Sequence, residues 1–154
     1  MKFLVQKKDI SKEFSLVYRS QEYSFDTEPS PGCGNTSILI NDLQLEVDED
    51  GEIIYVWGYN PLIQFQEIKE VPLQYRSKRI IVDVGKELIP GISHRLNEDT
   101  RWPVYINKKD NWICIGDPKV DDKDMVEFVP NCIAALKGEE LKAVWLHPQI
   151  IDFE

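Results

Sequence analysis

The fold of this chain is decided by residues 43–61, LQLEVDEDGEIIYVWGYNP. An apolar run, a tight acidic turn and a second apolar run follow one another, and the second run ends in Val-Trp with a proline shortly after. Residues 132–148, CIAALKGEELKAVWLHP, repeat this order. Both stretches are typical of β-hairpins, because apolar runs flank a short turn that contains glycine. The sequence therefore predicts a chain built mainly from hairpins.

The first hairpin can be read in register, because Asp50-Gly51 suits the positive φ angles of a two-residue type I′ turn. Side chains alternate between the two faces of a strand. One face then holds three pairs: Val47 with Ile54, Leu45 with Val56, and Leu43 with Gly58. The other face mixes polar with aromatic side chains: Gln44, Glu46 and Asp48 beside Ile53, Tyr55, Trp57 and Tyr59.

The second hairpin is apolar on both faces, which is typical of a strand pair in the centre of a sheet or between layers. A type II′ turn at Gly138-Glu139 pairs Leu136 with Leu141, Ala134 with Ala143, and Cys132 with Trp145. A helix over residues 131–145 is the alternative, because this stretch is rich in good helix formers. Gly138 in its middle and the apolar alternation after it favour the hairpin.

Further strands are predicted over residues 3–6 and 79–84, and a third hairpin over residues 102–116. Residues 12–20 form either a strand or a short helix. The Pro- and Gly-rich stretch 23–35 is typical of an exposed loop. At least seven strands follow, so we expect one domain, residues 1–154, that is mainly β: an antiparallel sandwich or a partly open barrel, with room for one helix as a lid. An α+β fold is the alternative.

Charge and composition restrict the partners and the compartment. The 154 residues carry a net charge of −9 with a pI near 4.8, so nucleic acid and anionic membranes are disfavoured and a basic partner is attracted. The apolar stretches are shorter than a membrane span, and the first residues do not have the pattern of a signal peptide. Three cysteines without paired spacing are typical of reduced thiols. We expect a cytoplasmic protein.

Catalytic and metal signatures are weak in this sequence. Cys33 lies in a turn-like stretch, and a nucleophilic cysteine needs a base that only His94 or His147 could supply. A zinc site would have to be built from these three residues together with Cys114 and Cys132. No two of the five have the short spacing of a structural zinc motif. We therefore predict no enzyme activity, no catalytic residue, no metal site and no cofactor.

The aromatic residues indicate a binding role, with core packing as the alternative. Trp and Tyr are enriched at the centres of interfaces, and acidic segments speed the capture of basic partners. Trp57 and Tyr59 are the expected anchors, since they share a face with Glu46. The complete set predicted to bind a partner is Glu46, Asp48, Glu49, Asp50, Trp57, Tyr59, Asp121, Asp122 and Asp124.

Residues 43–61 resemble segments of small bacterial proteins that are encoded beside polymorphic or contact-dependent growth-inhibition toxins and act as immunity proteins. The resemblance covers about one hairpin and the small, acidic character of the chain. It implies a cytosolic, stoichiometric inhibitor that binds one cognate toxin domain, often a basic nuclease. A β module that binds a small ligand or a carbohydrate without catalysis is the alternative, because aromatics and carboxylates also suit sugars.

Overall fold

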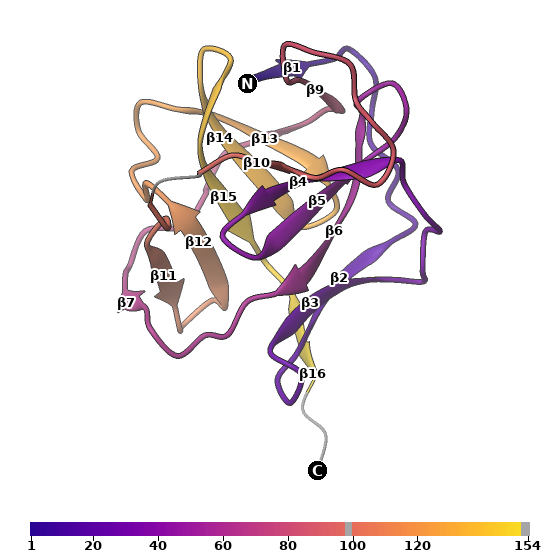
Figure 1. Ribbon diagram of the computed structural model, residues 1–154. Helices are drawn as coiled ribbons and strands as arrows, with labels where there is room; N and C mark the ends of the chain where they lie inside the picture. Colours follow the sequence, from indigo (N-terminus) through magenta and orange to yellow (C-terminus); the bar gives the residue numbers. More distant parts are fainter. Residues whose placement is uncertain (98–99, 152–154) are drawn as a thin grey trace.

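The structure is a computed structural model that describes residues 1–97 and 100–151, and these residues contain strands and no helix (Figure 1). Two sheets of seven strands each and one sheet of two strands are present, and none of the three closes into a barrel. The predicted mainly β sandwich is thus confirmed, while the barrel, the helical lid and the α+β fold are not found in the described residues. No helix that could cross a membrane occurs in this part of the chain.

The first sheet has the strand order β10-β4-β5-β6-β3-β2-β16, and the second has the order β7-β11-β12-β15-β14-β13-β8. The strands of the first sheet are β2 (Ser15–Arg19), β3 (Ser24–Glu28), β4 (Thr36–Ile40), β5 (Leu43–Val47), β6 (Ile53–Tyr59), β10 (His94–Arg95) and β16 (Gln149–Ile151). Those of the second are β7 (Gln66–Glu67), β8 (Arg76–Ser77), β11 (Val104–Asn107), β12 (Trp112–Gly116), β13 (Asp124–Val129), β14 (Cys132–Lys137) and β15 (Glu140–Leu146). The small sheet pairs β1 (Lys2–Val5) with β9 (Ile80–Asp83).

The hairpins pair antiparallel, whereas the outermost strand at each edge of the two large sheets pairs parallel with its neighbour. These four edge strands are only two or three residues long. Such short strands leave only a few unpaired backbone groups at the edges of the sheets. The two hairpins that decide the fold, β5–β6 and β14–β15, lie inside their sheets and away from these edges.

One apolar core fills the space between the two large sheets. Alternating side chains of both sheets contribute to it, since each strand turns every second residue inward. The small sheet closes one end with Phe3 and Ile80. Core residues of the large sheets include Phe25, Ile38, Leu45 and Val56 from the first, and Ile115, Val126, Phe128 and Val144 from the second.

The outer face of the second sheet is covered as well. Ile133 and Trp145 from β14 and β15 are fully buried there, and side chains of the connections around Ile68, Val71 and Val120 pack on them. The predicted central position of the second hairpin is confirmed, because β14 and β15 lie in the middle of their sheet and are buried on both faces.

The turn between β5 and β6 has three residues instead of the predicted two. The Asp48 carbonyl accepts a hydrogen bond from the Gly51 amide at 3.0 Å, and Gly51 has a φ of 86°. Asp50 does not have a positive φ, which the type I′ turn would require. The loop is therefore a type I turn followed by one left-handed residue, a position at which glycine is favoured.

A bulge beside this turn compensates for the extra loop residue. Val47 lies opposite Ile53, whereas the predicted partner was Ile54. Ile53 is consequently buried in the core and was wrongly predicted on the outer face. Beyond the bulge the other two predicted pairs are confirmed, Leu45 with Val56 and Leu43 with Gly58.

The turn between β14 and β15 is the predicted one, with Gly138 at a φ of 63° and Leu136 opposite Leu141. The helix over residues 131–145 is therefore excluded. A bulge at Lys142 then shifts the register by one residue, so the side chains of β15 beyond it change face. The pairs found are Ala134 with Val144 and Cys132 with Leu146, not the predicted Ala134 with Ala143 and Cys132 with Trp145.

The remaining predicted elements are found with three refinements. Residues 79–84 and 102–116 contain β9 and the β11–β12 hairpin as predicted, and the strand predicted over residues 3–6 is β1, which lies one residue earlier. Residues 12–20 contain a strand, β2. The predicted loop over residues 23–35 is shorter, because its first part forms β3 between β2 and β6.

Candidate partner-binding face

A row of three aromatic side chains lies on the outer side of the first sheet. We call this surface the aromatic face and define it as Tyr55, Trp57 and Tyr59 of β6 with Gln44 and Glu46 of β5. Alternation along β6 turns the residues between them inward, and the register puts Gln44 opposite Trp57 and Glu46 opposite Tyr55. The structure thus brings Glu46, Trp57 and Tyr59 together on one face, as expected.

Two of the three aromatic rings of this face, Trp57 and Tyr59, are accessible to solvent. Trp57 is 37% exposed and Tyr59 is 52% exposed. The indole Nε1 of Trp57 donates a hydrogen bond to Glu46 Oε1 at 3.0 Å. Trp57 therefore presents an apolar ring to solvent in an orientation that a neighbouring carboxylate helps to maintain.

The other end of the face is covered by the loop between β3 and β4. The Tyr55 hydroxyl donates to the Gly32 carbonyl at 2.9 Å, and the Gly34 amide donates to Glu46 Oε2 at 3.1 Å. One carboxylate therefore binds Trp57 through one oxygen and the loop through the other. This loop, which the sequence predicts as exposed, is fixed to the sheet by these two hydrogen bonds and by a third from the Asn35 amide to the Val47 carbonyl at 2.8 Å.

The pKa of Tyr55 lies above the ordinary value for a tyrosine. Partial burial, together with the negative charges at Glu46, Cys33 and Asp26, raises the pKa of Tyr55 to about 12. The phenol consequently stays protonated near neutral pH and remains a hydrogen-bond donor to the loop.

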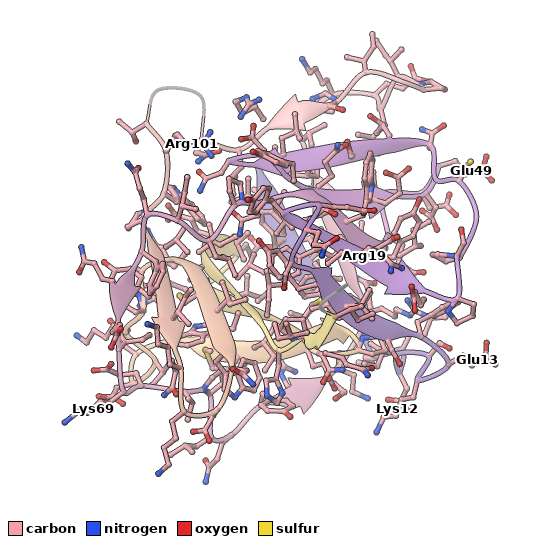
Figure 2. All side chains as sticks on the ribbon, turned by 90° about the horizontal axis from the view of Figure 1, so that it is seen from below. Lys12, Glu13, Arg19, Glu49, Lys69 and Arg101 are labelled. Carbon is pink, nitrogen blue, oxygen red and sulfur yellow. The ribbon has the colours of Figure 1, made fainter. Side chains whose placement is uncertain are left out.

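A small charged cluster lies on β3 and β2, the two strands that follow β6 in the order of the same sheet. The guanidinium of Arg19 on β2, which is labelled in Figure 2, pairs with the carboxylates of Glu28 and, at 3.9 Å, Asp26 on β3. Sequence reasoning missed these two carboxylates because it assigned β3 to a loop. The alternation of Phe25 and Thr27 with polar neighbours is the signal that indicates a strand here.

The acidic turn at residues 48–50 combines one structural and two exposed carboxylates. Asp48 Oδ1 accepts hydrogen bonds from the amides of Asp50 and Glu52, both at 2.9 Å. Asp48 therefore stabilises the turn, as short polar side chains often do. Glu49 and Asp50 are exposed and leave their charges to solvent.

The second predicted acidic segment is largely paired with cations. Asp122 lies within 3.7 Å of three lysine ammonium groups, and the hydrogen bond from Lys123 lowers the pKa of Asp122. Asp124 pairs with Arg76 at 2.7 Å. Asp121 is exposed. Most of the charge of this segment is therefore balanced locally.

The two acidic segments lie on opposite sides of the molecule. Figure 2 shows Glu49 and Lys69 at opposite sides, and Asp121 lines the same shallow cavity as Glu70, the neighbour of Lys69. The predicted partner-binding set is thereby divided. Glu46, Asp48, Glu49, Asp50, Trp57 and Tyr59 belong to the β5–β6 hairpin, and Asp121, Asp122 and Asp124 belong to the region around β13.

The residues weighed for catalysis do not assemble. Cys33 is exposed, and no hydrogen bond joins it to either histidine within the described residues. Cys114 and Cys132 are buried, and burial raises the pKa of both thiols. Residues 1–97 and 100–151 contain no group of three His, Cys, Asp or Glu side chains that could hold a metal ion.

Comparisons of the chain with protein-family models, with curated proteins and with solved structures find no match. What the aromatic face does must therefore be inferred from its own geometry and charge.

Proposed function

We propose that this protein binds another protein through the aromatic face and that binding is its function. The observation that supports this proposal is the exposed pair of Trp57 and Tyr59 on a sheet surface, with Glu46 bonded to the indole. Large rigid aromatics supply most of the binding energy at many interfaces and lose little conformational entropy. A sheet surface offers this pair to the broad surface of a macromolecule.

The charge of the chain favours a basic partner. The net charge is −9, and the exposed carboxylates of Glu49 and Asp50 lie at the end of the hairpin that carries the aromatic face. Such carboxylates accelerate the approach of a basic protein, and desolvated aromatics then lengthen the lifetime of the complex. Acidic steering and aromatic anchoring thus come from one element.

The resemblance of residues 43–61 to immunity proteins suggests which partner this is. We infer a cytosolic immunity protein that neutralises one cognate bacterial toxin domain by forming a stoichiometric complex, without catalysis. A nuclease fits the electrostatics, because nucleases need a basic surface to bind their substrate. The complex would neutralise the toxin by covering that surface.

Co-expression tests this proposal. The partner to use is the variable C-terminal toxin domain that this proposal predicts in a secreted protein encoded immediately upstream of this gene. We expect the parental chain to restore growth to cells that express the toxin, and Trp57→Ala/Tyr59→Ala to fail at an equal protein level. Tyr75→Ala, which removes an exposed aromatic beside β8 in the second sheet, is the matched control and should restore growth. A metabolic operon in place of a toxin gene, or full rescue by the double variant, contradicts the proposal.

A further inference from the structure

A second candidate site lies at the end of the sandwich, away from the aromatic face. An open groove with a volume of about 1040 Å³ runs between β1, β10 and the turn of β14 and β15. In Figure 1 the amino terminus and this turn lie at the upper end of the molecule, above β10. We call this hollow the end groove. Its lining includes Lys2, Lys86, Arg95, Lys137, Ile92 and Trp102.

The end groove has the opposite charge balance from the chain. The chain has 27 acidic and 18 basic residues, whereas the groove is lined by the four cationic side chains just named and by two carboxylates, Glu139 and Glu140. Glu140 is paired at 2.9 Å with Lys142 and Lys137 at 3.7 Å with Asp122, and neither of these two partners lines the groove. Within the described residues Lys2 and Lys86 form no ion pair. Their positive charge is therefore available to an anionic ligand.

Among the described residues, the groove also contains backbone and side-chain hydrogen-bonding groups for which no partner is found. β10 is the last strand of its sheet, and its pairing with β4 uses the Leu96 amide, so alternation turns the Arg95 amide and carbonyl toward the free edge. These two groups suffice for one pair of backbone hydrogen bonds to an extended peptide that lies beside β10. His94 also lines the groove, and its Nε2 is a buried atom without a hydrogen-bond partner in the described part of the chain.

We propose that the end groove binds an extended acidic peptide segment that pairs with the free edge of β10. The cations would bind its carboxylates, and Ile92 and Trp102 would contact its apolar atoms. A compact polyphosphate would use the charges alone and leave the strand edge unpaired. This site is separate from the aromatic face, so the proposal stands or falls independently of the proposed function.

Fluorescence anisotropy with a labelled peptide of alternating glutamate and threonine tests this assignment on the full chain. We expect Lys2→Gln/Lys86→Glu to weaken binding about tenfold, because exposed charges contribute modestly each. The control Lys12→Gln/Lys109→Glu makes the same change in net charge at exposed residues that do not line the groove. It should bind within about twofold of the parental protein. Equal binding by all three proteins overturns the proposal.

Two further probes separate the peptide from a simple anion. A glutamate–threonine peptide that is N-methylated at alternate residues keeps its charge but cannot pair with β10, and we expect it to bind much more weakly. Inorganic tripolyphosphate should compete poorly. If tripolyphosphate binds in a Lys2- and Lys86-dependent way while the peptide does not, or if N-methylation has no effect, the peptide assignment is wrong. Melting temperatures of the variants show that each one is folded.

Discussion

At the scale of single residues, Glu46 connects the parts of the aromatic face. Its two oxygens accept hydrogen bonds from the Trp57 indole and from the Gly34 amide. Bonds to a carboxylate are stronger than bonds between neutral groups. Glu46 is therefore expected to order both the ring that contacts a partner and the loop beside it.

We predict that Glu46→Ala lowers the free energy of unfolding by about 1–2 kcal/mol, because both donors lose their acceptor. Glu46→Gln retains one acceptor oxygen and should lose about half of that. Urea unfolding measures the loss. Amide hydrogen exchange at Gly34 and the indole N–H resonance of Trp57 report which of the two contacts is broken. An unchanged Trp57 resonance in Glu46→Ala would mean that this carboxylate does not orient the ring.

Tyr55 makes the folding stability of the protein depend on pH in the alkaline range. Burial, followed by the neighbouring negative charges, raises its pKa to about 12, while an unfolded tyrosine titrates near 10. The folded state therefore holds this proton more tightly. The resulting stabilisation is fully present below pH 10 and is lost as the pH rises through 12.

We expect Tyr55→Phe to lose less stability than the parental protein between pH 10 and pH 12. The variant should already be less stable at neutral pH, since the bond to the Gly32 carbonyl is gone. Unfolding curves at a series of pH values measure both effects. Parallel alkaline losses in the two proteins would contradict the raised pKa of Tyr55.

At the scale of elements, hairpins are predictable here because their periodicity and their turn glycines are local signals. Bulges are not, because an extra residue in a strand reflects how the sheets pack. The two hairpins show both outcomes. In the first hairpin the extra turn residue and the bulge shift the register in opposite directions, so the predicted pair of Leu45 with Val56 is correct. At Ala134 a bulge without such compensation moves Val144 into the core.

A substitution at Gly116 tests how tightly β12 and β15 are packed. It has a φ of 117°, and a Cβ there would lie 2.4 Å from the Lys142 carbonyl oxygen and 2.8 Å from the Trp102 ring. We expect Gly116→Ala to cost about 3 kcal/mol, from backbone strain and overpacking together. Gly138→Ala is the matched control, because its φ is also positive but its Cβ would meet open space. It should cost about 1 kcal/mol in chemical denaturation. Equal costs would refute the close contact at Gly116.

At the scale of the whole molecule, composition predicts the sign of the partner's charge but not where the acidic residues gather. The sequence suggests two acidic segments that act together, and the structure places them on opposite sides. No local pattern reports that arrangement, because it depends on how the two sheets stack. The aromatic face itself was within reach of sequence reasoning, since alternation and register along one hairpin define it.

Electrostatic steering by the β5–β6 turn is the next prediction. Glu49→Lys/Asp50→Lys should slow association with the cognate toxin domain about tenfold at low salt and flatten the salt dependence of the on-rate. Glu70→Lys/Asp121→Lys changes the net charge equally on the opposite side and should slow association less. Stopped-flow mixing at several salt concentrations compares them. Equal on-rates for the two variants would remove the steering role of the turn.

The central claim is that Trp57 and Tyr59 anchor a protein partner, and calorimetric titration with the toxin domain that the proposed function predicts tests it most directly. The parental chain should form a one-to-one complex. Trp57→Ala/Tyr59→Ala should weaken it about a hundredfold, as loss of two interface anchors does, while Tyr75→Ala leaves the affinity within about twofold. A double variant that binds as tightly as the parental chain would contradict the claim.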